Sequence, residues 1–358
     1  MSKKEKLNSL QVLRAAAFLE IFLGHCGIAF FTGAFGVSIF VTLSGFCMAI
    51  NRLPKPETLT SSFGRNLRSA FQRIKKLYGL HLIMLVCIWV IVKMPHSANA
   101  IRRFVMDVLL LQCMSPQSAD YFSYNGVAWY LSMYLFLSVA APYVLLLLAK
   151  VQKKGVLFGL SAAVFGVMVG AGVYVSKRTI PIGDDFAYWF TYVSPFYRIL
   201  EFFLGAALGW LYCRREEKET DSLWKSTAAE ILTVAAVVGV IEIFHWMENR
   251  MILRGICYTA LFTPVSLCLV WVFAGRGGFL RRLLDRKWLI RLGDLSAYTF
   301  LIHQVVIRWM SPLLDQRFSG NQKIFFLTIG CFLLTVCLAQ LWSWLEKRTF
   351  VKSKKENR

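Results

Sequence analysis

Long apolar runs recur from one end of the chain to the other, separated by short polar segments that are mostly basic. Most of the runs approach 20 residues, the length an α-helix needs to cross a hydrocarbon core of about 30 Å. Every backbone group of such a helix is bonded within the helix, whereas an open strand would leave groups unpaired in lipid. The pattern predicts an all-α polytopic membrane protein. Ten transmembrane helices are expected, at 11–31, 34–50, 77–94, 127–149, 156–176, 193–213, 227–247, 255–274, 294–312 and 324–345.

The remaining segments are too short or too polar to add a second domain. The apolar segment Phe104–Met114 is too short to span and is expected to be interfacial or re-entrant. Of the 358 residues, 57% are hydrophobic and 17% are charged, and no long polar stretch could build a soluble unit. Residues 1–358 are therefore expected to form one membrane domain that ends in a basic tail, 346–358.

The distribution of basic residues predicts the orientation. With a cytoplasmic N-terminus, 29 of the 41 Lys and Arg residues fall in segments on the cytoplasmic side and 8 in outside loops, the positive-inside bias. Both termini are then cytoplasmic, and the protein is expected in the cytoplasmic (inner or plasma) membrane as a multi-pass protein. The net charge of +21 is explained by loops beside anionic membrane lipids, so nucleic-acid binding is not expected. The other four basic residues lie inside spans: Arg14, Lys93, Arg198 and Arg308.

The cysteines and glycines predict structure rather than chemistry. The nine cysteines contain no CxxC pair and lie mostly in spans, so neither disulfides nor a metal site is expected. Three small-residue pairs, each four residues apart, are expected to let neighbouring helices approach closely: Gly155/Gly159, Gly166/Gly170 and Gly205/Gly209.

The stretch LRAAAFLEIFLGHCG at 13–27, within the first span, contains ionisable residues that indicate a function. Arg14 and His25 are eleven residues apart, about three turns plus 20°, so they share one helix face about 16 Å apart. Glu20 is rotated by about 240° from Arg14 and is expected to pair elsewhere. An ionisable residue inside a span is costly unless it faces a polar interior. The pair predicts a polar cavity entered from the cytoplasm, with Arg14 near the mouth and His25 deeper.

These residue types suit group transfer. Arginine presents a fork of donors for phosphate or carboxylate, and histidine accepts a proton near neutral pH and activates hydroxyls. The structural alternative is that Arg14 snorkels to the cytoplasmic interface while His25 bonds a neighbouring helix.

Several motifs, in order along nearly the whole chain, resemble one family. LNSLQVLRAAAFLEIFLGH, with Arg14 and His25, and GVSIFVTLSGF (36–46) resemble the first two helices of the integral-membrane acyltransferases that O-acylate sugars and other hydroxyl compounds (acyltransferase family 3). RIKKLYGLHL (73–82) is similar to the family's basic third-helix segment, although Lys76 replaces the usual second arginine and Gly79 the usual proline. Further similar segments are AWYLSMYLF (128–136), SPFYRILEFFLGAALGWL (194–211), LSAYTFLIHQVVI (295–307) and SWLEKR (343–348). The fourth helix lacks the acidic residue that often follows its serine.

The resemblance implies an O-acetyltransferase that moves an acyl group, commonly acetyl from acetyl-CoA, to a hydroxyl of a glycan or other cell-envelope acceptor. CoA would bind from the cytoplasm, where its phosphates could meet Arg14, Arg73 and Lys76, although the last two also serve topology. In the proposed mechanism His25 removes the proton of the acceptor hydroxyl, which attacks the thioester. Ser44, Ser132 and Tyr298 are candidates for stabilising the oxyanion. A covalent acyl intermediate on a serine or on His25 stays open, as do the acceptor and a succinyl donor.

Several other polar or aromatic residues in or near the spans could have a structural or a functional role. Arg198 and Glu201, spaced i, i+3, are favoured as a structural ion pair. His303 matches a family position and is either a site residue or a helix-bonding one. Trp129 is either a cavity residue or an interface anchor. His81, His96 and His245 are expected to be incidental.

Transport is the alternative function. Ten helices around a polar face also describe a transporter or a conduit for acyl groups or substrate, although no inverted repeat is evident. No extracytoplasmic hydrolase-like domain, which some relatives carry, is expected in this chain. The acceptor would then reach the membrane cavity itself or a separate extracytoplasmic transferase partner would complete the transfer. The oligomeric state stays open.

Overall fold

A computed structural model describes residues 8–92, 97–178, 180, 182–183, 185–215, 222–250, 253–275 and 277–356. Within these residues the chain is helical with no β-strand, so the protein is an all-α polytopic membrane protein, as predicted. The helices are α1 (Asn8–His25), α2 (Ala34–Arg52), η1 (Pro56–Thr58), α3 (Phe63–Val92), α4 (Ala98–Val108), η2 (Gln112–Met114), α5 (Ser118–Tyr121), α6 (Trp129–Ala149), α7 (Lys154–Ser176), α8 (Phe186–Tyr188), η3 (Trp189–Val193), α9 (Pro195–Cys213), α10 (Leu223–Asn249), α11 (Arg254–Cys257), α12 (Thr263–Ala274), α13 (Phe279–Leu284), α14 (Lys287–Asp315) and α15 (Gly320–Glu356).

Each of the ten predicted spans contains helix, but seven helices of the described residues have the length and apolarity of a membrane span. The three others are α1, α12 and α14. The helix α12 has only 12 residues, and α14 carries charged residues along its 29. The number of crossings and the placement of both termini therefore stay predictions.

Two helix boundaries differ from the sequence prediction. The first helix ends at His25, six residues before the predicted end at 31, because Gly27 adopts φ 89° and turns the chain. The third helix begins at Phe63, fourteen residues before the predicted start, so Arg73 and Lys76 lie on helix rather than in a loop.

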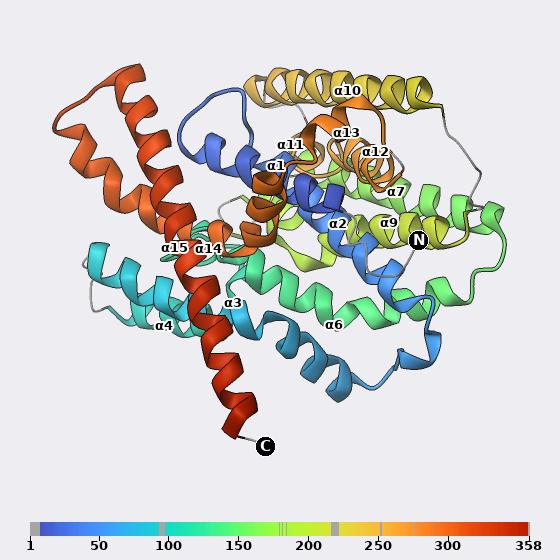
Figure 1. Cartoon of the computed structure of the whole chain (residues 1–358), viewed down its shortest axis with the longest axis horizontal. Helices are drawn as coiled ribbons and strands as arrows, with labels where there is room; N and C mark the ends of the chain where they lie inside the picture. The colour runs from blue at the N-terminus through green and yellow to red at the C-terminus, as the bar shows by residue number, and fades with distance from the viewer. Residues whose placement is uncertain are drawn as a thin grey trace.

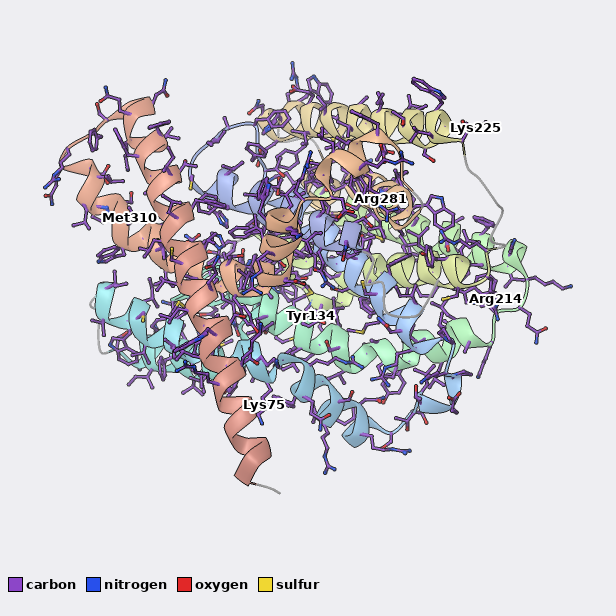
Figure 2. The ribbon with its side chains drawn as sticks, viewed as in Figure 1. Lys75, Tyr134, Arg214, Lys225, Arg281 and Met310 are labelled. Carbon is purple, nitrogen blue, oxygen red and sulfur yellow. The ribbon has the colours of Figure 1, made fainter. Side chains whose placement is uncertain are left out.

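Two consecutive helices, α1 and α2, form the centre of the molecule with two helices from later in the chain, α9 and α14. The most extensive packing joins α2 to α9 and α1 to α14, and α1 also packs on α2. In Figure 1, α1 and α2 lie in the middle, α10 crosses the top and α15 runs along one side. Basic side chains at the periphery include Lys75, Arg214 and Lys225, as Figure 2 shows. The central helices therefore carry the polar residues that are shielded from lipid.

Glycine permits the closest of these helix contacts. A Cβ on Gly45 would lie 2.1 Å from the carbonyl oxygen of Phe202, and one on Gly205 would lie 2.2 Å from that of Thr42. The prediction of close packing therefore holds for Gly205 and Gly209, both on α9. It is wrong for Gly155/Gly159 and Gly166/Gly170, because a Cβ on any of these four would meet nothing within 4 Å. Those glycines lie on α7, a helix whose side chains are largely exposed.

A buried carboxylate fixes the connection between the first two helices. Glu20 accepts hydrogen bonds from the backbone N–H groups of Thr32 (2.9 Å), Gly33 (2.9 Å) and Gly36 (2.8 Å), and from the Thr32 hydroxyl. These N–H groups surround the start of α2, where a helix has unpaired donors and a positive dipole end. The sequence analysis correctly separated Glu20 from Arg14 but did not identify this partner.

We predict that Gly45→Ala lowers the free energy of unfolding by about 1–3 kcal/mol, the usual cost of overpacking. The added methyl group would force α2 and α9 apart. Thermal unfolding in detergent micelles measures the change. Gly159→Ala is the matched control and should unfold at or above the wild-type temperature, because its methyl group meets open space. Equal midpoints for the two variants would contradict the proposed packing.

Candidate active site

A cavity of about 210 Å³ lies where α1 ends, against the connection to α2, the start of α6 and the middle of α14. Polar groups and aromatic rings share its wall. Its lining residues are Ile21, His25, Thr32, Gly33, Val37, Phe122, Gly126, Val127, Trp129, Tyr188, Tyr192, Phe300, Gln304 and Arg308. His25 and Trp129, which the sequence pointed to, are thus brought together in one cavity.

His25 is paired with a second histidine. Its Nδ1 lies 2.9 Å from Nε2 of His303, and the two rings stack with centroids 5.2 Å apart. The other ring nitrogen of His303, Nδ1, lies 3.2 Å from the carbonyl oxygen of Thr299. A carbonyl only accepts, so His303 Nδ1 carries the proton and its Nε2 accepts one from His25 Nδ1. In this arrangement Nε2 of His25 carries a lone pair.

The phenyl rings around His303 hold this pair in place. Phe18, Phe22 and Phe300 lie with ring centroids 5.9, 6.2 and 5.7 Å from that of His303. All three rings are buried, and so is His303. His303 is therefore a fixed partner in the core, whereas His25 is exposed in the isolated chain and borders the cavity.

Arg14 does not line this cavity. Its guanidinium contacts Oε1 of Gln11 (3.2 Å) and Sγ of Cys47 (3.8 Å), and that of Arg73 contacts the sulfur of Met48 (3.4 Å). Both arginines are half-buried beside consecutive residues of α2, and neither forms an ion pair with a carboxylate of the described chain. The expected single cavity from Arg14 to His25 is corrected to two separate regions.

Apolar side chains account for this separation. Phe18 and Phe22 are fully buried on the stretch of α1 between Arg14 and His25, and Ile21 is 2% exposed. We call Arg14 and Arg73 the arginine pair; it lies toward the predicted cytoplasmic side, while His25 lies at the opposite end of α1.

Lys76 is already matched by a carboxylate. Its ammonium lies 2.7 Å from Oε1 of Glu346, and the Tyr298 hydroxyl donates to Oε2 of the same carboxylate at 2.6 Å. This contact ties α3 to α14 and α15. The charge of Lys76 is neutralised at the helix interface, which favours the structural reading for Lys76 over the CoA-binding one.

The three hydroxyls considered for oxyanion stabilisation are all engaged. Ser44 donates to the carbonyl of Phe40 (2.7 Å) and Ser132 to that of Leu110 (2.6 Å). Tyr298 donates to Glu346, as above. None of these residues lines the cavity. The Ser44 bond lies within α2, whereas those of Ser132 and Tyr298 join separate segments of the chain.

Arg198 and Glu201 form a fully buried cluster. Nη1 of Arg198 lies 2.6 Å from Oε2 of Glu201, and both side chains are 0% exposed. Ser38 of α2 also donates to Glu201, and Thr263 of α12 lies 3.3 Å from Oε1. Nε of Arg198 donates to the carbonyl of Tyr192 (2.8 Å), a residue of the cavity wall. The geometry is that of the structural ion pair expected from the sequence.

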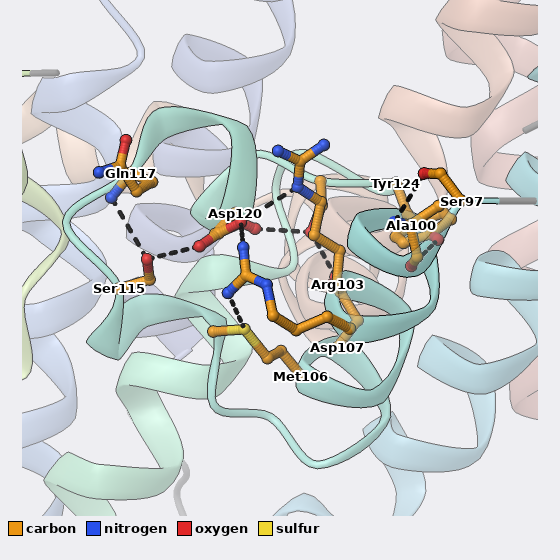
Figure 3. A network of polar contacts seen from close by, with 11 residues as sticks. Ser97, Ala100, Arg103, Met106, Asp107, Ser115, Gln117, Asp120 and Tyr124 are labelled. Carbon is orange, nitrogen blue, oxygen red and sulfur yellow. Dashed lines mark hydrogen bonds and ion pairs between the residues drawn. The ribbon is translucent and has the colours of Figure 1, made fainter. Parts of the chain in front are cut away.

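Residues 97–126, which we call the outer cap, close the cavity on the side of Phe122 and Gly126. Figure 3 shows the polar network that holds the cap together. Arg102 (2.6 Å) and Arg103 (3.0 Å) donate to Oδ1 of Asp120, and the Ser115 hydroxyl donates to Oδ2 (2.7 Å). The predicted interfacial segment, Phe104–Met114, thus covers the second half of α4 and all of η2, and the ion pairs of Arg102 and Arg103 with Asp120 lie on either side of it.

A second carboxyl in the outer cap has no cationic partner among the described residues. Asp107 is buried and accepts from the Ser123 hydroxyl, and burial raises its pKa well above the usual value. Burial alone would also raise the pKa of Asp120, but the bonds from Ser115, Arg102 and Arg103 outweigh it and lower that pKa.

Other candidate residues have structural partners or lie elsewhere. Nε2 of His81 is 3.0 Å from the carbonyl oxygen of Asp107, and Nε2 of His245 is 3.3 Å from that of Phe30. His96 lies outside the described residues. Within the described chain, no three His, Cys, Asp or Glu side chains gather as a metal site requires, and the nine cysteines are free thiols.

The sequence analysis did not assign two residues of the cavity wall. Arg308, one of the four basic residues within predicted spans, lines it together with Gln304. The signal was present, because an arginine inside a span is a functional candidate by default. Gln304 lies within the motif at 295–307 but was not singled out there, and Arg308 is the first residue after that motif.

The site thus consists of a histidine pair beside a cavity at one end of α1, with Arg14 of α1 and Arg73 of α3 in a separate region. The family model described as an acyltransferase domain matches residues 7–344, nearly the whole chain. The chain belongs to acyltransferase family 3 and is a membrane acyltransferase.

One curated relative supports the same class. The chain is 26% identical over 289 residues to the acyltransferase MdmB of Streptomyces mycarofaciens, covering 77% of this chain and 69% of the relative. No solved structure matches the chain.

We predict that Asp120→Asn lowers the free energy of unfolding at pH 7 by about 1 kcal/mol, whereas Asp107→Asn leaves it unchanged or raises it. Asp120 has a lowered pKa, so its contribution is present above the ordinary value of about 3.9 and is lost as pH falls through the folded value. Its partners are partly exposed, which keeps the effect small.

The opposite sign applies to Asp107. Its pKa is raised, so its neutral form contributes stability that is lost as pH rises, and Asn mimics that form. Thermal unfolding of the wild type and both variants between pH 3 and 8 measures the two effects. Equal losses for the two variants at pH 7 would disprove the assignment.

Proposed function

We propose that the protein is an O-acetyltransferase of the cytoplasmic membrane, which moves acetyl from cytoplasmic acetyl-CoA to a hydroxyl of a glycan or other cell-envelope acceptor. The observation that carries the proposal is the position of His25, held by His303 and bordering the cavity. Family membership supports acyl transfer, and the histidine pair supports a general base for a hydroxyl.

The donor is proposed to bind at the arginine pair. Arg14 and Arg73 contact only neutral groups of the described chain, so their charges are available for phosphate groups. Both lie toward the end of the bundle where acetyl-CoA would arrive. Arg14 and His25 lie about 16 Å apart along α1, and an extended CoA arm that covers this length would have to pass the buried side chains of Phe18 and Phe22.

The hydrogen-bond pattern of the histidines gives His25 its role. With Nδ1 donating to His303, Nε2 of His25 is the atom that removes the proton of the acceptor hydroxyl. The hydroxyl oxygen then forms a bond to the thioester carbonyl carbon as the carbon–sulfur bond breaks. The proton passes from His25 to the departing CoA thiolate, so the products are the ester and free CoA. His303 is a positioning residue, because it touches His25 rather than substrate.

Aromatic residues of the cavity favour a ring-shaped acceptor. Trp129, Tyr188, Tyr192 and Phe300 provide flat apolar surfaces, while His25 provides the polar group that orients a hydroxyl. In the predicted orientation this cavity lies toward the outer side of the membrane, near the outer cap. Acceptor and donor would thus approach His25 from opposite ends of α1.

We predict that His25→Ala reduces turnover of acetyl-CoA at least 100-fold while CoA binding is retained, the size expected for loss of a general base. Labelled acetyl-CoA hydrolysis or transfer by purified protein in detergent measures turnover, and equilibrium binding is followed in parallel. His245→Ala is the matched control, because His245 is bonded to a carbonyl outside the cavity. A His25→Ala protein with wild-type turnover would refute the proposed base.

If neither the wild type nor the His25→Ala protein consumes acetyl-CoA, the result would point to another acyl donor. It would also favour the transporter reading, in which unmodified substrate crosses a membrane. Flux of labelled substrate into proteoliposomes distinguishes that case.

We further predict that Arg14→Gln raises the KM for acetyl-CoA about tenfold or more and leaves turnover at saturation within a few-fold of wild type. Removing a phosphate contact that is equal in ground and transition states weakens binding without slowing chemistry. Arg348→Gln is the matched control, since its guanidinium lies over the Trp344 ring at 3.7 Å and is distant in sequence from the arginine pair. An unchanged KM for Arg14→Gln would remove Arg14 from the donor site.

A further inference from the structure

Arg308 is a half-buried charge that the proposed chemistry does not use. It lies on α14, five residues beyond His303, and both it and His25 line the cavity. The guanidinium is half-buried and donates from Nη1 to the carbonyl oxygen of Tyr124 at 2.7 Å. That is the one hydrogen bond that it makes within the described residues, although a guanidinium has five N–H donors.

The cavity around Arg308 has no negative charge to match it. None of the fourteen lining residues is acidic, and Arg308 is absent from the ion pairs of the described chain. The other arginine near this wall, Arg198, is neutralised by Glu201. An arginine within a predicted span that faces a cavity without a carboxylate partner is placed for an anionic ligand.

The backbone around Arg308 is built to hold it there. Tyr124, whose carbonyl receives the guanidinium, adopts φ 47°, a conformation that is uncommon for a residue with a side chain. The neighbouring Asn125 donates to the carbonyl of Leu301 on α14 at 2.9 Å, which fixes the outer cap against the same helix. Arg308 is thus oriented by the cap rather than extended into solvent.

We propose that Arg308 binds a carboxylate or phosphate group of the acceptor, so that the cavity takes a hydroxylated ring with a negative charge. This inference rests on the proposed acetyl transfer at His25. Five residues of helix place Arg308 roughly 7.5 Å further along α14 than His303. One end of a ring then reaches His25 and the other reaches the guanidinium, with Phe300 and Trp129 in the wall. Arginine suits both anions, because its planar fork matches their oxygens.

The test compares sugars that differ in charge, with the full chain in detergent micelles. D-glucuronate, D-glucose 6-phosphate and D-glucose are added singly, and binding is measured from ligand-dependent thermal stabilisation. We expect at least one anionic sugar to bind wild type tenfold or more tightly than glucose. The two anionic sugars separate carboxylate from phosphate. Equal or tighter binding of glucose would overturn the proposal without the use of any variant.

Variants of Arg308 test whether this residue causes the preference for an anionic sugar over glucose. Arg308→Gln should bind the anionic sugar and glucose equally, and Arg308→Lys should keep part of the preference because the charge remains. Arg317→Gln is the matched control, since Arg317 is exposed beyond the end of α14 and does not line the cavity. A preference that survives Arg308→Gln, or that Arg317→Gln removes equally, would overturn the assignment. If Arg308→Gln does not fold, the comparison of anionic sugars with glucose in the wild type still tests the proposal.

Acetyl-CoA turnover, measured in the same samples, separates this inference from the proposed function. Anion-selective binding without acetyl-CoA turnover would refute the acetyltransferase proposal and keep the anion site. Turnover without anion-selective binding would keep the acetyltransferase proposal and refute the anion site.

Discussion

Lipid offers no hydrogen-bond partner, so a polar group in the interior of this protein can be paired only within the protein. An isolated charge there is expensive, and a charge with full hydrogen-bonding is not. Glu20 and Glu201 illustrate the constraint: the first accepts four hydrogen bonds around the start of α2, and the second is held by Arg198, Ser38 and Thr263. Glu20 thereby joins α1 to the start of α2, and Glu201 joins α9 to α2 and α12.

The same constraint separates charges that have a carboxylate partner from those proposed to bind a ligand. Lys76 and Arg198 have carboxylate partners, and the hydroxyls of Ser132 and Tyr298 have acceptors. Arg14, Arg73 and Arg308 contact neutral groups instead. Arg14 and Arg73 lie beside α2, whereas Arg308 lies in the wall of the cavity that His25 also lines.

Helix packing decides how these groups are held at fixed positions. Gly45 and Gly205 let α2 and α9 approach at backbone contact, and this places Ser38 beside Glu201. The long pairing of α1 with α14 brings His25 to His303, although 278 residues separate them in sequence. The outer cap borders the cavity and is held to α14 by hydrogen bonds to the backbone carbonyls of Tyr124 and Leu301. Within the cap, Asp120 accepts from Arg102 and Arg103.

The sequence by itself determined the helical membrane class, the approximate spans and the family, because hydropathy and ordered motifs are properties of the linear chain. It also singled out Arg14 and His25 and separated Glu20 from Arg14, since helical rotation alone fixes which residues share a face. Only the tertiary structure decided that His303 is the partner of His25, that Arg14 and His25 occupy different regions and that Lys76 is matched by Glu346. It also revealed Arg308 in the cavity wall and showed that the glycines of α7 do not pack. Each of these depends on which helices become neighbours, and spacing along one helix carries no information about the helix that faces it.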